Sequence, residues 1–88
     1  MAQVRTILPS HLGREVRAEY ARATAEHGPF HSAHEGYAVL LEECDELWDE
    51  VRKRRALRDV GRMRQELIQI AAMALRFITD VCEASDHV

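Results

Sequence analysis

The sequence lacks the short motifs by which several enzyme classes are recognised. It contains no glycine-rich phosphate-binding loop, no serine nucleophile elbow and no Cys-x-x-Cys pair. These absences exclude P-loop nucleotide binding, serine hydrolysis of the α/β-hydrolase type and dithiol redox chemistry. The two cysteines, Cys44 and Cys82, both have apolar neighbours, so we expect reduced thiols in the core and no disulfide. His27, His31 and His34 do not converge with Cys44, which argues against zinc.

Long apolar runs are also absent. Arg76 and Asp80 interrupt the most apolar segment, which therefore falls short of the roughly 20 apolar residues that span a bilayer. The first nine residues contain no apolar stretch long enough for a signal peptide. The net charge is −3, and no basic stripe runs along a whole predicted helix, which argues against nucleic acid. We expect a cytoplasmic protein whose partners include neither membranes nor nucleic acid.

Helical periodicity is what the 88 residues do contain. Apolar residues make up 47% of the chain, which suits one small globular domain over residues 1–88. The predicted helices span residues 12–27, 32–53 and 60–82. A turn is expected within residues 54–59, a loose arm at 1–9 and a frayed tail at 84–88. The predicted fold class is all-α, a small antiparallel bundle of about three helices per chain.

Chemical signals mark the ends of these helices. Ser10 is predicted to be the N-cap of the first helix, and Gly28-Pro29 is predicted to end it. Ser32-x-x-Glu35 has the pattern of a capping box at the start of the second helix. Asp59 is the expected N-cap of the third helix.

The third predicted helix has more apolar surface than one small domain needs. Its apolar side chains cover close to half of its circumference, against the roughly 100° stripe of an ordinary surface helix. Burying the excess requires a further partner, so we expect a homodimer or a homotetramer.

The second predicted helix separates apolar from acidic side chains. Its apolar arc contains Tyr37, Leu40, Leu41, Cys44, Leu47, Trp48 and Val51. Its acidic arc contains Glu35, Glu42, Glu43, Glu46, Asp49 and Glu50. We expect the apolar arc to face the core. Carboxylates three and four residues apart on a helix repel one another, so a bound cation is expected on the acidic side.

The acids of this helix have a counterpart on the third helix. Glu42, Glu43 and Glu46 fall within an arc of about 100°, and antiparallel packing would bring Glu66 opposite them. Carboxylates without histidine or thiolate partners suit Mg²⁺ or Mn²⁺. Mg²⁺ held by carboxylates commonly shares its remaining positions with phosphates. The expected substrate is therefore a polyphosphate.

The pattern Glu42-Glu43-x-x-Glu46, nineteen residues, then Glu66-x-x-Gln69 resembles a known signature. It is similar to E-E-x-x-E … E-x-x-D of the MazG-like, all-α nucleoside triphosphate pyrophosphohydrolases, and the resemblance covers residues 30–78. It implies Mg²⁺-dependent cleavage of a ribo- or deoxyribonucleoside triphosphate to monophosphate and pyrophosphate. It also implies that the four glutamates are catalytic metal ligands, with Gln69 at a fifth ligand position.

Gln69 departs from the family pattern, which has an acid there. A neutral amide binds metal less strongly and cannot act as a general base. The alternative function is therefore a non-catalytic MazG-like module that binds a nucleotide or serves in helical assembly. A plain helical dimerisation protein with a solvated acidic face is the third interpretation.

Four further residues are candidates for substrate binding. Phe30-His31 resembles the Phe-His that opens the matching helix in the deoxycytidine-triphosphate pyrophosphatase branch, which implies that His31 borders the nucleotide. Trp48 either stacks on a base or belongs to the core. Arg52 and Lys53 either contact phosphates or complement the C-terminal end of the second helix.

Overall fold

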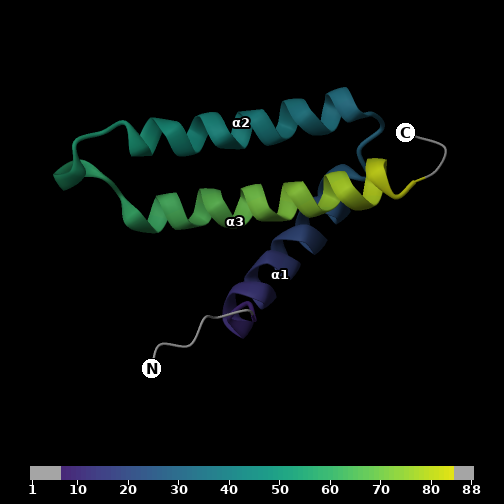
Figure 1. The fold of residues 1–88 in the computed structure, drawn as a ribbon, viewed down its shortest axis with the longest axis horizontal. Helices are drawn as coiled ribbons and strands as arrows, with labels where there is room; N and C mark the ends of the chain where they lie inside the picture. The colour runs from purple at the N-terminus through teal and green to yellow at the C-terminus, as the bar shows by residue number, and fades with distance from the viewer. Residues whose placement is uncertain (1–6, 85–88) are drawn as a thin grey trace.

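The computed structural model describes residues 7–84, and its regular structure is helical throughout this range. The elements are α1 (Ser10–His27), α2 (Ala33–Val51), a short 3-10 helix (Arg55–Leu57) and α3 (Val60–Phe77), which continues as a π-helical segment (Ile78–Cys82). α2 and α3 lie side by side and antiparallel, while α1 crosses obliquely and packs against α3 (Figure 1). The all-α prediction is confirmed for the described residues. Most of the predicted arm and tail, residues 1–6 and 85–88, lies outside them.

Two of the predicted helix starts are confirmed. At α2, the Ser32 hydroxyl accepts from the Glu35 N–H at 3.1 Å, and the Glu35 carboxylate accepts from the His31 N–H at 2.7 Å. At α3, the Asp59 carboxylate accepts from the Arg62 N–H at 3.0 Å. The prediction for Ser10 was wrong, because the helix begins two residues before the predicted start at residue 12 and Ser10 already lies inside it.

The end of α1 follows the predicted Gly-Pro signal. Gly28 has a φ of 72°, a left-handed conformation that glycine adopts without a steric penalty, and its N–H donates to the Thr24 carbonyl at 2.9 Å. Within residues 7–84, no helix has both the length and the apolar character needed to cross a bilayer.

The core is small and lies where the helices meet. Its buried apolar residues are Ala23, Phe30, Ala72, Met73 and Val81. The expectation that the apolar arc of α2 faces this core was largely wrong, because Tyr37, Leu41, Cys44 and Trp48 are exposed and Leu40 is the member that packs against the core. The expectation that Cys44 and Cys82 lie in the core was also wrong, because both are exposed; both thiols are free, as expected. α2 instead meets α3 through the side that carries Gly36, where the absent side chain permits close approach.

Replacing Gly36 tests this close approach. A Cβ there would lie 2.7 Å from Phe77 Cδ2 and 3.3 Å from Phe30 Cδ2. We expect Gly36→Ala to lower the free energy of unfolding by about 1–3 kcal/mol, because overpacking outweighs the higher helix propensity of alanine. Gly13→Ala is the matched control, since its Cβ would meet only Leu8 at 3.5 Å and should stabilise α1 by up to about 1 kcal/mol. Urea denaturation measures both, and stabilisation by both changes would contradict the packing.

A buried carboxylate fixes the connection between α2 and α3. Glu50 is only 2% exposed, and its carboxylate accepts from the Asp59 N–H at 2.6 Å and from Lys53 Nζ at 2.9 Å. These two hydrogen bonds, with Lys53 the larger contributor, lower the pKa of Glu50. Glu50 therefore does not belong to the solvent-facing acidic arc, because the backbone before α3 requires an acceptor at this point.

Removing the charge of Glu50 should loosen this connection. Glu50→Gln is expected to lower the melting temperature by at least about 4 °C, the shift expected for one buried hydrogen bond in a domain of this size. Asp49→Asn changes the neighbouring carboxylate, which is exposed and lies 3.5 Å from Arg52, and should shift the melting temperature very little. Equal shifts in the two variants would refute the role given to Glu50.

Candidate functional site

Three carboxylates from two helices converge in the α2–α3 pair. Glu43 and Glu46 lie one turn apart on α2, and Glu66 projects from α3. One oxygen from each of the three lies within 4.8 Å of the other two. Antiparallel packing thus places Glu66 opposite two of the predicted acids. Glu42 is exposed and stands outside this acidic trio.

The members of the acidic trio destabilise one another's charges. The pKa of Glu43 is raised to about 7, first by burial and then by repulsion from Glu46. The pKa of Glu46 is raised as well, chiefly by its hydrogen bond to Glu66, and Arg62 opposes this shift. Three oxygen donors with no nitrogen or sulfur ligand among them fit a hard divalent cation, which would favour the ionised forms of all three.

Gln69 lies one turn beyond Glu66 and links the two helices. With its amide nitrogen toward the acids, it donates to Glu43 at 2.7 Å and to Glu66 at 3.2 Å. The Gln69 side chain thus lies beside the acidic trio, where the sequence predicts a fifth metal ligand. Rotation of the amide would present its oxygen, a neutral ligand, to the same place.

A cleft of about 430 Å³ opens between α1, α2 and α3, and Glu43 is the member of the acidic trio that lines it. Its volume is in the range of small-molecule sites. Residues on its walls include Glu42, Glu43, Gln69, Phe30, His31 and Arg76. Gln69 and Arg76 are seven residues apart on α3, a rise of roughly 10 Å. The cleft therefore runs from an acidic end to a cationic end.

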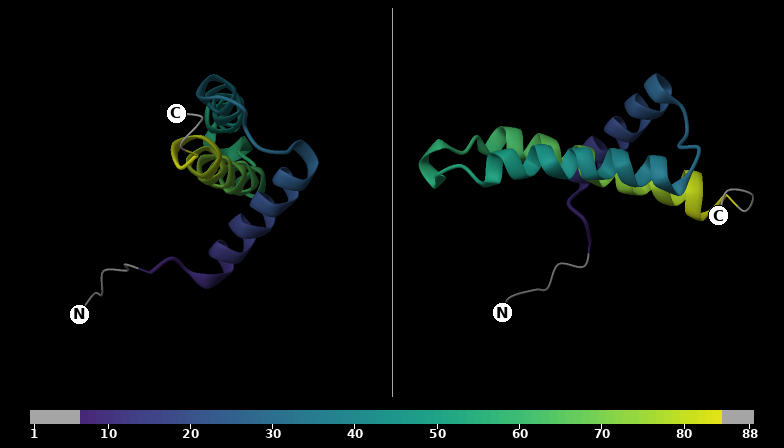
Figure 2. Two further views of the ribbon diagram at one scale, coloured as in Figure 1. Left: turned by 90° about the vertical axis from the view of Figure 1, so that its right-hand side faces the viewer. Right: turned by 90° about the horizontal axis from the view of Figure 1, so that it is seen from above.

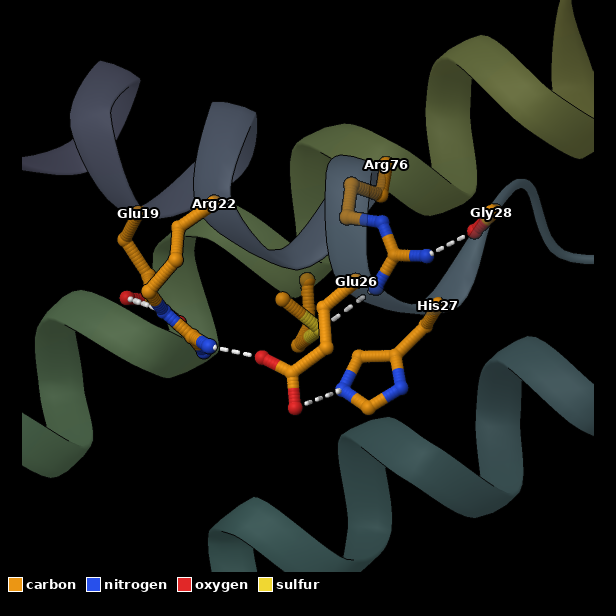
Figure 3. Close-up of polar contacts among 7 residues, drawn as sticks. Glu19, Arg22, Glu26, His27, Gly28 and Arg76 are labelled. Carbon is orange, nitrogen blue, oxygen red and sulfur yellow. Dashed lines mark hydrogen bonds and ion pairs between the residues drawn. The ribbon is translucent and has the colours of Figure 1, made fainter.

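Arg76 forms the cationic end and is 2% exposed. Its guanidinium lies 4.3 Å from the centre of the Phe30 ring. It donates to the Gly28 carbonyl at 2.5 Å and to the Met73 sulfur at 3.3 Å (Figure 3). Its Nε has no hydrogen-bond acceptor among the described residues. The buried guanidinium contributes positive potential at this end of the cleft, which the nearby Glu35 carboxylate partly offsets.

The α1 side of the cleft carries charges that are already paired. Arg22 contacts Glu19 at 2.6 Å and Glu26 at 2.5 Å, and His27 lies 3.7 Å from Glu26 (Figure 3). The hydrogen bond from Arg22 lowers the pKa of Glu19. Arg22 therefore already has two acidic partners on its own helix.

The predicted substrate-binding residues separate into two groups. His31 lines the cleft, is exposed, and its Nδ1 lies 3.4 Å from Glu35. Trp48 does not line it and is exposed on the apolar arc of α2. Arg52 pairs with Asp49 at 3.5 Å and Lys53 with Glu50 at 2.9 Å, and neither lines the cleft. Within one chain, His31 is thus the member of this group that the fold brings to the site.

Sequence reasoning missed Arg76 as a site residue. It considered Arg76 only as an interruption of an apolar segment. The available signal was the position itself, because a single arginine inside an apolar helical stretch needs a buried partner or a ligand. Comparison of the chain with protein-family models, curated proteins and solved structures finds no match, so the functional argument rests on the residues of this site.

Proposed function

We propose that this protein is a Mg²⁺-dependent nucleotide pyrophosphohydrolase, which converts a ribo- or deoxyribonucleoside triphosphate to monophosphate and pyrophosphate. The observation that carries this proposal is the convergence of Glu43, Glu46 and Glu66 beside a cleft of small-molecule size. The cationic end formed by Arg76 adds support, because an anionic ligand would compensate its buried charge. The resemblance of the glutamate pattern to MazG-like enzymes supports the same reaction.

Each residue has a role in this proposal. Glu43, Glu46 and Glu66 hold Mg²⁺ or Mn²⁺, while Glu42 at the cleft wall and Gln69 complete the ligand set. Bound Mg²⁺ would neutralise charge on the phosphate chain. A carboxylate of the cluster would orient a water molecule and take its proton. The water oxygen bonds to the α-phosphorus while the bond to the bridging oxygen breaks, and pyrophosphate leaves. The nucleoside extends toward His31.

Because Gln69 is neutral where the family pattern has an acid, the alternative function is a module that binds nucleotide without turnover. The test is pyrophosphate release from the common ribo- and deoxyribonucleoside triphosphates, with Mg²⁺ and then with Mn²⁺. Turnover of one or a few substrates by the wild type supports the hydrolase. Turnover by Gln69→Asp alone identifies a binding module, and release from no nucleotide by either protein overturns the proposal.

Self-association belongs to the same proposal. The buried apolar core of the described residues is small, and α3 leaves Leu67, Leu75 and Ile78 exposed. A homodimer or homotetramer would bury this surface and compensate for the thin stability margin of a chain of this length. Arg52 and Lys53 would then contact substrate only from a second subunit. Two exposed free thiols also favour a reducing cytoplasmic location.

A further inference from the structure

One side of the α2–α3 pair carries exposed apolar side chains, and at its edge Leu67 also lines an apolar groove with Leu12 and Val16 of α1. We call this side the α2–α3 apolar face, and its exposed side chains are Tyr37, Leu41, Cys44, Trp48, Leu67 and Ile78. The register of the helices places both stripes on the same side. Cys44 follows the α3-facing Glu43 by one residue, and Leu67 follows the α2-facing Glu66 by one residue. In an antiparallel pair, equal rotations along each chain lead to the same side.

α1 occupies another flank of α3. Its Tyr20 and Glu15 bond to Thr79 at 2.8 Å and to Arg64, and the end-on view shows it on one side only of the pair (Figure 2, left). The α2–α3 apolar face is two helices wide and roughly 28 Å long, from the 19 residues of α2. This is the size of one half of a four-helix bundle, which a second such face would complete.

The charge along the α2–α3 pair is strongly uneven. Residues 52–64, at the end where α2 connects to α3, contain seven lysine and arginine side chains and one acid, Asp59. Their net charge of +6 leaves −9 on the rest of a chain whose total is −3. We call this end the cationic tip (Figure 1). The opposite end of the pair carries three acids, Glu35, Asp80 and Glu83, against one buried arginine, Arg76.

We propose that two copies of this chain pair through the α2–α3 apolar face with their helix pairs antiparallel, so that the cationic tip of each copy lies beside the acidic end of the other. This inference rests on the self-association proposed above and specifies its surface and orientation. Parallel pairing would place two tips of +6 each within about one Debye length, whereas antiparallel pairing separates them by roughly the length of the helices. Charge therefore selects between two arrangements that apolar burial alone leaves equal.

The surface is tested by adding one charge to it. Cys44→Glu places a carboxylate in the centre of the α2–α3 apolar face, and Ala38→Glu places one on an exposed position of α2 outside it. By sedimentation velocity, we expect wild type and Ala38→Glu to be dimers and Cys44→Glu to dissociate at least tenfold more readily. A monomeric wild type, or a Cys44→Glu protein that associates as tightly as wild type, overturns the inference.

The orientation is tested with a spin label on the cationic tip. Ala56→Cys, in a Cys44→Ser, Cys82→Ser background that still dimerises, places the label at residue 56. Electron paramagnetic resonance should then give a label separation above about 30 Å. A separation below about 20 Å, or rapid disulfide formation between the two introduced thiols before labelling, overturns the antiparallel arrangement. Pyrophosphate release by monomeric Cys44→Glu would leave the hydrolase proposal standing, so the two proposals fail independently.

Discussion

Glu46→Gln is expected to lower the rate of pyrophosphate release by at least about 100-fold while the protein stays folded. The amide keeps the shape of the side chain but removes one of the three charges that converge on the metal position. Because the carboxylates of the acidic trio repel one another, the loss of one should not destabilise the metal-free fold. The measurement is kcat at saturating nucleotide and Mg²⁺, with circular dichroism to establish folding.

Asp49→Asn provides the control for this prediction. Asp49 lies one turn after Glu46 on α2, but it is exposed and its partner is Arg52 rather than the acidic trio. Its replacement should leave kcat within about twofold of the wild type, because surface ion pairs contribute little. A Glu46→Gln protein that turns over at the wild-type rate, or a loss of equal size in Asp49→Asn, would contradict the catalytic role of Glu46.

The second large effect is an unusual dependence of stability on pH. The pKa of Glu43 is raised from its ordinary value of 4.5 to about 7 in the folded chain. A carboxyl whose pKa is higher in the folded than in the unfolded state adds stability below the unfolded pKa, and this stability is lost as pH rises through the folded pKa. The melting temperature of the metal-free protein should therefore fall between about pH 5 and pH 8.

Mg²⁺ should reverse this dependence. Metal binding requires ionised carboxylates, so the stabilisation by Mg²⁺ should be larger at pH 8 than at pH 6. Glu43→Gln should melt at a higher temperature than the wild type at pH 8 in chelator and should gain little from Mg²⁺. Differential scanning calorimetry at both pH values measures these shifts. A wild-type melting temperature that rises from pH 5 to pH 8 without metal would refute the charge repulsion in the acidic trio.

The features predictable from the sequence are those governed by short-range chemistry. Ser32 and Asp59 cap their helices because the hydrogen bonds involved span only three residues. The spacing of Glu43 and Glu46 places them on one side of α2 whatever lies around that helix. Antiparallel packing of the second and third helices then predicts that Glu66 lies close to these two residues.

The features that sequence reasoning missed depend on which side of α2 meets α3. Amphipathic periodicity shows that one face is apolar, but it does not distinguish burial within the chain from burial between chains. Because Gly36 permits close approach, the side of α2 that carries Gly36 and Glu43 faces α3, and Trp48 remains exposed to solvent. Glu50 and Arg76 are buried because each bonds to a backbone group outside its own helix. Glu50 accepts from the Asp59 N–H, and Arg76 donates to the Gly28 carbonyl. The spacing of residues along one helix does not predict such partners.

The most direct test of the metal site is Mn²⁺ binding, followed by the electron paramagnetic resonance signal of the free ion. At pH 8 the wild type should bind at least one Mn²⁺ per chain, and excess Mg²⁺ should release it. The Glu43→Gln, Glu46→Gln double variant should bind none at the same concentrations while remaining folded. Binding by the wild type that Mg²⁺ displaces and the double variant lacks is the predicted result. No binding by the wild type, or undiminished binding by the double variant, would contradict the account.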